Sequence, residues 1–231
     1  MHIEIWSDVI CPFCYIGKTQ LEAALAQVGA SATIEHKAFR LMPGEAVSPV
    51  EEMFVRKYGR TPEQAIASMR NVEDMAAQEG LEFHIPGTQT GDTTDAHKLL
   101  LFAGDKGLQA PLLNRLYRAY FTETRNIFER GTLLDLATEV GLNRGEAESA
   151  LGSAELKARV EADQRTAQNF NVRGVPFVVI DRKLAVSGAQ GTAHFVQALQ
   201  AAIAQSPIKD ASSSGVCDVT GCEPIAPDPG V

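Results

Sequence analysis

The chain has 231 residues, of which 45% are hydrophobic, and this is enough for one large domain or two closely joined ones with a substantial core. A formal net charge of −8, with no basic run, argues against a nucleic-acid groove. The sequence has no apolar stretch near the roughly 18 residues that span a bilayer, and no signal-type segment at its N-terminus. We therefore expect a cytoplasmic protein without nucleic-acid or membrane partners.

The N-terminal segment predicts a β-α-β unit. Ile3 to Trp6 is rich in residues that favour strands, and apolar residues recur at helical spacing from about Tyr15 until Gly29 ends the run. Thr33 to Phe39 predicts a second strand. Because a helix connects the two strands, we expect them to be parallel.

The segment Cys11-Pro12-Phe13-Cys14 lies at the junction of the first strand and this helix. Unpaired backbone N–H groups and the positive end of the helix dipole stabilise a thiolate there. The thiolate is the species that exchanges disulfides. We therefore predict that Cys11 is a redox nucleophile. Cys14, one turn into the helix and less exposed, is then the resolving thiol that releases the substrate from a mixed disulfide.

The rest of the chain divides into a long helical stretch and a short return to strands. From about Pro49 to Asn169 the pattern is helical almost throughout, with a capping box at Thr61–Gln64. Phe177–Asp181 and Leu184–Ser187 then predict a hairpin, and a closing helix follows it. The expected order is therefore β-α-β, a helical insertion, and β-β-α.

From Gln205 onward the composition is that of a linker, rich in Ser, Gly and Pro, yet this tail holds Cys217 and Cys222. Cys217 lies twelve residues after Gln205, and a flexible linker of this length reaches about 20 Å. The tail pair can therefore meet Cys11 at an effective concentration near millimolar. In a cytosolic protein, close cysteine pairs are usually catalytic or redox-sensing. We predict an auxiliary redox pair, with an idle pair of exposed thiols as the alternative.

Four segments, in this order, carry a resemblance to a known family. They are Ser7-Asp8-Val9-Ile10-Cys11-Pro12-Phe13-Cys14-Tyr15, Asp95-Ala96-His97, Gly174-Val175-Pro176-Phe177 and Val186-Ser187-Gly188-Ala189-Gln190. The chain resembles the disulfide oxidoreductase A (DsbA-like) family, and within it the FrnE-type branch. That branch is related to kappa-class glutathione transferases and 2-hydroxychromene-2-carboxylate isomerases. The resemblance covers about residues 2 to 204 and leaves out the tail.

The resemblance implies an α/β thioredoxin fold, β-α-β then β-β-α, with a large helical insertion. We expect a thioredoxin-like domain at 1–48 and 170–204, an inserted helical domain at 49–169, and a linker-like tail at 205–231. It also implies that Val175, before a cis Pro176, faces the dithiol. A trans proline that opens a strand is the alternative.

The function implied is that of a protein disulfide oxidoreductase, acting as a reductase, isomerase or oxidase of protein disulfides. A reducing cytosol favours reductase or isomerase work, whereas a role in oxidative stress would cycle the protein in both directions. Pro12, Phe13, Val175 and Pro176 are expected to position the substrate. Phe13 supplies neither charge nor polar hydrogen, which predicts a milder oxidant than disulfide oxidoreductase A, whose potential is near −120 mV. We expect no metal and no cofactor beyond the redox-active disulfides. The expected partners are protein thiols or disulfides and a thioredoxin or glutathione reducing system, with the protein a monomer or homodimer.

Two other functions compete with this prediction. A structural zinc site formed by Cys11, Cys14, Cys217 and Cys222 has the right ligand count, but zinc would quench the nucleophile. A glutathione-dependent isomerase or transferase is suggested by the same relatives. Those relatives usually have a serine where this chain has Cys11, and they do not need Cys14, so the intact pair disfavours them.

Two further residues receive no catalytic role from the sequence. Trp6 in a strand is typical of a core residue. His97 belongs to one of the family segments, but Asp95-Ala96-His97 equally fits an ordinary helix start that is capped by Asp95.

Overall fold

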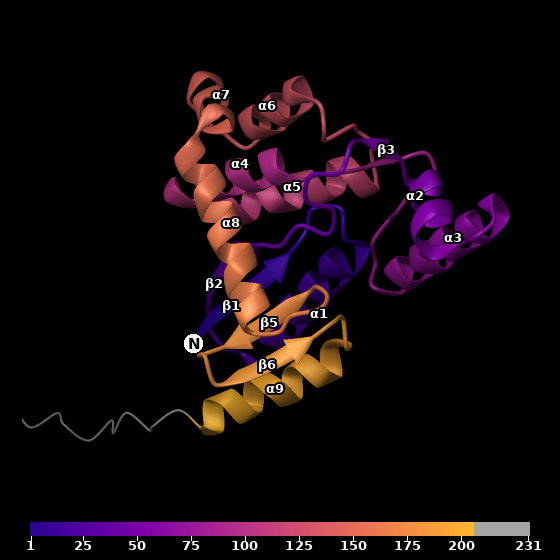
Figure 1. Cartoon of the computed structure of the whole chain (residues 1–231). Helices are drawn as coiled ribbons and strands as arrows, with labels where there is room; N and C mark the ends of the chain where they lie inside the picture. The colour runs from indigo at the N-terminus through magenta and orange to yellow at the C-terminus, as the bar shows by residue number, and fades with distance from the viewer. Residues whose placement is uncertain (206–231) are drawn as a thin grey trace, which may run out of the picture.

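The computed structural model describes residues 1–205 (Figure 1). Its main sheet has four strands in the order β2-β1-β5-β6. β1 (His2–Ser7) pairs in parallel with β2 (Thr33–Ala38) and antiparallel with β5 (Phe177–Ile180). β5 pairs antiparallel with β6 (Leu184–Ser187). The predicted parallel pair and the predicted hairpin are both confirmed, and the sheet is that of the thioredoxin fold.

Helices enclose both faces of this sheet. α1 (Pro12–Val28) joins β1 to β2, and α9 (Thr192–Ala204) follows β6. These two helices pack together over one face, where Ile3, Ile5 and Phe195 share a hydrophobic cluster. α8 (Ala154–Asn169) crosses the other face and links the upper helices to the sheet (Figure 1).

The chain between β2 and β5 forms the helical insertion. Its helices before α8 are α2 (Val50–Tyr58), α3 (Pro62–Gln78), α4 (Thr94–Asp105), α5 (Gln109–Phe121), α6 (Arg130–Glu139) and α7 (Arg144–Gly152). A short ribbon, β3 (Ser48–Pro49) paired with β4 (Gln89–Thr90), interrupts them, and the helical pattern did not indicate it. In Figure 1, α2 and α3 lie to one side of the insertion, while α4 to α7 lie above the sheet.

Local signals in the sequence account for several helix ends. Gly29 ends α1 with φ 66°, a left-handed conformation that glycine adopts without steric cost. Thr61 and Gln64 form the predicted capping box of α3. α1 itself begins at Pro12, three residues before the predicted start, because a proline at the first helical position gives up an N–H that would be unpaired there.

Alternation along β1 divides its side chains between the two faces of the sheet. Ile3 and Ile5 point to α1 and α9, whereas Trp6 is fully buried on the face covered by α8. The Trp6 indole N–H donates to the Asp163 carbonyl oxygen at 3.0 Å, which ties α8 to the sheet. Trp6 is thus a core residue, as predicted. None of the helices between residues 1 and 205 has the length and apolar character to cross a membrane.

Candidate active site

The dithiol lies where β1 ends and α1 begins. Cys11 is the N-cap residue of α1, in an extended conformation, and Cys14 follows inside the first turn. The two residues approach to 3.2 Å, and both are free cysteines. Cys11 is 4% exposed and Cys14 only 1%, so Cys11 is the more accessible of the two. This is the geometry that the strand–helix junction predicts for a nucleophile and a resolving thiol.

The environment of the pair keeps the proton on the inner sulfur. Burial raises the pKa of the Cys14 thiol well above its ordinary value, and its hydrogen bond with Cys11 and the negative charge of a Cys11 thiolate raise it further. The backbone N–H of Asp8 acts in the opposite direction. Cys14 therefore keeps its proton more firmly than an ordinary thiol and serves as a hydrogen-bond donor to Cys11.

The loop before β5 lies against the dithiol. The Val175–Pro176 peptide bond is cis, as predicted, and the Cys11 sulfur lies 3.6 Å from the Val175 carbonyl oxygen. Gly17 of α1 makes this approach possible, because a Cβ on Gly17 would lie 2.9 Å from the Pro176 ring. Pro176 itself is buried, so it shapes the loop while Val175 faces the site.

A buried polar group lies behind the dithiol, and the sequence analysis missed it. His97 of α4 has Nε2 3.3 Å from Asp8 Oδ1, and the other Asp8 oxygen accepts from the Leu41 N–H at 2.7 Å. Asp95 does not cap α4, as the ordinary interpretation of this segment expected, but pairs with Lys98. Asp8 and His97 both lie in segments of the family resemblance, and this was the available signal.

An apolar cavity of about 290 Å³ opens beside Cys11. The dithiol helix and the Val175 loop form one wall, to which Pro12, Phe13 and Gly174 contribute. The opposite wall comes from the helical insertion and includes Met53, Phe54, Lys57, Tyr58, Met69 and Val72. Of the predicted positioning residues, Pro12, Phe13 and Val175 thus line the space next to Cys11.

One group of potential metal ligands lies far along β1 from the dithiol. His2, Glu4 and Glu35 hold ligand atoms within 4.8 Å of one another. Arg182 pairs with Glu4, and Lys37 pairs with Glu35, so cations of the protein already neutralise both carboxylates. The predicted tail pair, Cys217 and Cys222, lies outside the described residues, and so does half of the alternative zinc site.

Comparison with known proteins identifies the family. A sequence model described as the DSBA-like thioredoxin domain matches residues 2–200. The chain belongs to the DSBA-like thioredoxin domain family. This is a family of thiol–disulfide oxidoreductases, and the Cys11–Cys14 pair lies at the strand–helix junction of its thioredoxin fold. Membership of the FrnE-type branch stays a prediction.

Individual relatives of this DSBA-like protein agree with that assignment. The crystal structure of a probable DsbA oxidoreductase, SCO1869 from Streptomyces coelicolor, is 37% identical with a TM-score of 0.86, covering 98% of this chain and 100% of that one. The uncharacterized protein YwbO of Bacillus subtilis (strain 168) is 27% identical over 203 residues, 86% of this chain and 96% of that protein.

A more distant structure shares the fold alone. It is the cytosolic disulfide reductase DsbM from Pseudomonas aeruginosa with GSH, at 21% identity and a TM-score of 0.65, covering 88% of this chain and all of that one.

Proposed function

We propose that this protein is a thiol–disulfide oxidoreductase that acts on protein disulfides through Cys11 and Cys14. The observation that carries the proposal is the asymmetry of the pair. Cys11 caps α1 and faces the Val175 loop and an open cavity, whereas Cys14 is buried and keeps its proton. Such a pair supplies one nucleophile and one resolving thiol.

The reductive direction takes two exchange steps. The Cys11 thiolate attacks a substrate disulfide, forms a mixed disulfide with one substrate sulfur, and releases the other as a thiolate that takes a proton from water. Cys14 then gives up its proton and attacks Cys11, so the Cys11–Cys14 disulfide forms and the second substrate thiol leaves. A thiol donor returns the dithiol to its reduced state, and substrate oxidation runs the same steps in reverse.

The cavity and the relatives together support the choice of partners. An apolar space next to the nucleophile suits the side chains of an unfolded or flexible protein segment better than a polar metabolite. We propose that a thioredoxin or glutathione system supplies electrons in the cytoplasm, in line with the DsbM neighbour, which is named a cytosolic disulfide reductase. The chemistry needs no cofactor beyond the dithiol.

We propose in addition that Cys217 and Cys222 form an auxiliary pair that exchanges with Cys11. The short spacing of this second pair and the linker-like composition between it and Gln205 support the idea. In a Cys14→Ser protein, an intramolecular disulfide from Cys11 to the tail is then the expected product, and mass spectrometry of thiol-trapped protein detects it. Kinetics unchanged by a Cys217→Ser/Cys222→Ser double substitution would remove the tail from the cycle.

Insulin reduction with a dithiol donor, and refolding of a scrambled disulfide protein, test the main proposal. We expect Cys11→Ser to abolish both activities and Cys14→Ser to accumulate mixed disulfides with the substrate, because the resolving thiol is gone. Full activity in the Cys11→Ser protein would contradict the proposal. A glutathione-dependent isomerase, the competing function, would instead keep its activity in the Cys14→Ser protein.

A further inference from the structure

The cavity beside Cys11 is rich in methionine. Three of the five methionines of the chain, Met42, Met53 and Met69, line it. Methionine side chains are unbranched and polarisable, and they adapt to apolar partners of different shapes. The volume of about 290 Å³ lies just below the ~300–1,000 Å³ typical of ligand pockets, so the cavity suits one or two large side chains.

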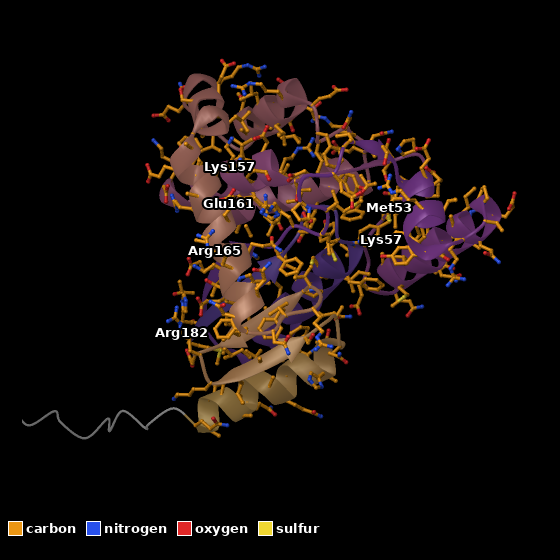
Figure 2. The ribbon with its side chains drawn as sticks, in the orientation of Figure 1. Met53, Lys57, Lys157, Glu161, Arg165 and Arg182 are labelled. Atoms are coloured by element: carbon orange, nitrogen blue, oxygen red, sulfur yellow. The ribbon has the colours of Figure 1, made fainter. Side chains whose placement is uncertain are left out.

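Lys57 gives this apolar cavity a charge. It is the one cation among the lining residues, no carboxylate lines the space, and Figure 2 places Met53 and Lys57 together on α2. The neighbouring Arg56 pairs with Glu45 at 2.6 Å, whereas Lys57 is exposed and has no acidic partner within residues 1–205. An unpaired ammonium at the edge of an apolar space is complementary to a carboxylate on whatever fills that space.

The surroundings favour a peptide chain over a small molecule. Phe13 is 38% exposed and Tyr58 57% exposed, so apolar surface continues past the cavity on both walls. Val175 lies just before β5, whose ladder with β1 begins at Phe177, and its backbone is thus placed to pair with an extended segment. Gly174 next to it adds no side chain that would block the approach.

We propose that the cavity beside Cys11 binds a protein segment in which a large apolar side chain flanks the reactive cysteine and a carboxylate follows it, with Lys57 pairing with that carboxylate. This inference rests on the proposed function and adds to it a class of substrate. Met42, Met53 and Met69 accept apolar side chains of many shapes, and the charge of Lys57 discriminates between acidic and basic segments. An acidic segment is therefore preferred over a basic one of the same apolar content.

Matched peptides test the preference directly. Each carries one cysteine as a mixed disulfide with thiopyridine, an uncharged leaving group that is followed by absorbance. The peptides differ only beyond the cysteine, where they read Leu-Glu, Leu-Lys or Gly-Glu. With the full-length reduced protein, the single-turnover rate constant for Leu-Glu is expected to exceed that for Leu-Lys by up to about fivefold, the range of a partly exposed ion pair. It is expected to exceed that for Gly-Glu by about tenfold or more, the range of one buried side chain.

A charge reversal and a matched control give the decisive comparison. Lys57→Glu is expected to invert the order of the Leu-Glu and Leu-Lys peptides. Arg60→Glu makes the same change of charge three residues further on, just past the end of α2. Arg60 is exposed and does not line this cavity, so this variant is expected to keep the wild-type order. Equal effects of the two substitutions would mean a general field of the surface and would overturn the inference.

The outcomes separate this inference from the function on which it rests. If the wild-type protein forms the Cys11–Cys14 disulfide with 4,4′-dithiodipyridine but treats the Leu-Glu and Leu-Lys peptides alike, the inference is wrong and the proposed exchange stands. If that disulfide forms with none of the probes, the proposed function itself fails. A Lys57-dependent preference for small carboxylate-bearing disulfides, without one among the peptides, would overturn the choice of a protein segment.

Discussion

His97 Nε2 lies 3.3 Å from Asp8 Oδ1 directly behind the dithiol, and the two side chains are 3% and 0% exposed. The contact joins residues that are 89 positions apart, and it fixes α4 of the helical insertion to the turn that leads into Cys11. The other Asp8 oxygen holds the Leu41 N–H, so one carboxylate braces three segments around the site.

Removal of the Asp8 carboxylate is expected to destabilise the protein strongly. In Asp8→Ala both the Leu41 N–H and His97 lose their buried partner, which we expect to cost about 3 kcal/mol in the free energy of unfolding. Asp8→Asn keeps an oxygen for Leu41 and should cost about 1 kcal/mol. Urea unfolding measures both. Asp95→Asn is the control, because Asp95 is half-exposed and lies on α4, the helix of His97. An equal loss of unfolding free energy in Asp95→Asn would contradict a structural role of the Asp8 carboxylate.

The stability of the reduced protein is expected to fall with rising pH above about 9. Burial and the Cys11 sulfur raise the pKa of Cys14 in the folded protein above its ordinary value of 9.0. The unfolded chain therefore loses this proton first, so the stabilisation is complete below pH 9 and is lost as pH rises towards the folded pKa, by up to about 1.4 kcal/mol per pH unit.

Urea unfolding between pH 8 and pH 10 checks this dependence. Cys14→Ala should have a flatter profile than the wild type over that window. Burial also raises the pKa values of Tyr117 and Tyr120. These two residues change the unfolding free energy mainly above pH 10, and thus little between pH 8 and pH 10. Parallel profiles for the two proteins would show that Cys14 is not held protonated by the fold.

At the acid side, His36 is expected to limit stability. Burial, aided by the charge of Lys18, lowers the pKa of His36 from 6.5 to about 3. Below pH 6.5 the imidazole of His36 takes up a proton in the unfolded chain but stays neutral in the folded protein. The folded protein therefore loses stability as pH falls below 6.5, by about 2 kcal/mol at pH 5.

His36→Leu removes this titration while leaving the backbone bonds of residue 36 to Gln109 in place. We expect its unfolding free energy to vary less than that of the wild type between pH 6.5 and pH 5, measured by urea unfolding. The same acid slope in both proteins would assign the loss to other groups.

A methyl group at Gly17 is expected to disturb the active site from inside α1. Its Cβ would meet the buried Pro176 ring at 2.9 Å, so the Val175 loop has to shift away from Cys11. We expect Gly17→Ala to destabilise the protein by about 1–3 kcal/mol and to slow insulin reduction. Gly131→Ala in α6 has open space around its Cβ and should instead stabilise by about 0.4–1 kcal/mol with unchanged activity. Thermal unfolding and turnover separate the two variants.

The sequence by itself determined the elements whose signals are local. The strand–helix junction at Cys11, the Gly29 helix end, the Thr61 cap and the hairpin of β5 and β6 all depend on neighbouring residues, and all are found close to where they were expected. Periodicity and capping act over one or two turns of chain, which is why they can be recognised without the fold.

The tertiary structure alone decided which distant residues meet. The pairing of Asp8 with His97, the contact of Gly17 with Pro176 and the position of Lys57 at the cavity beside Cys11 each bring together segments that no local pattern relates. A lone buried aspartate or an exposed lysine has no sequence signature of its own, because its role is set by the charge, burial and shape of what packs against it.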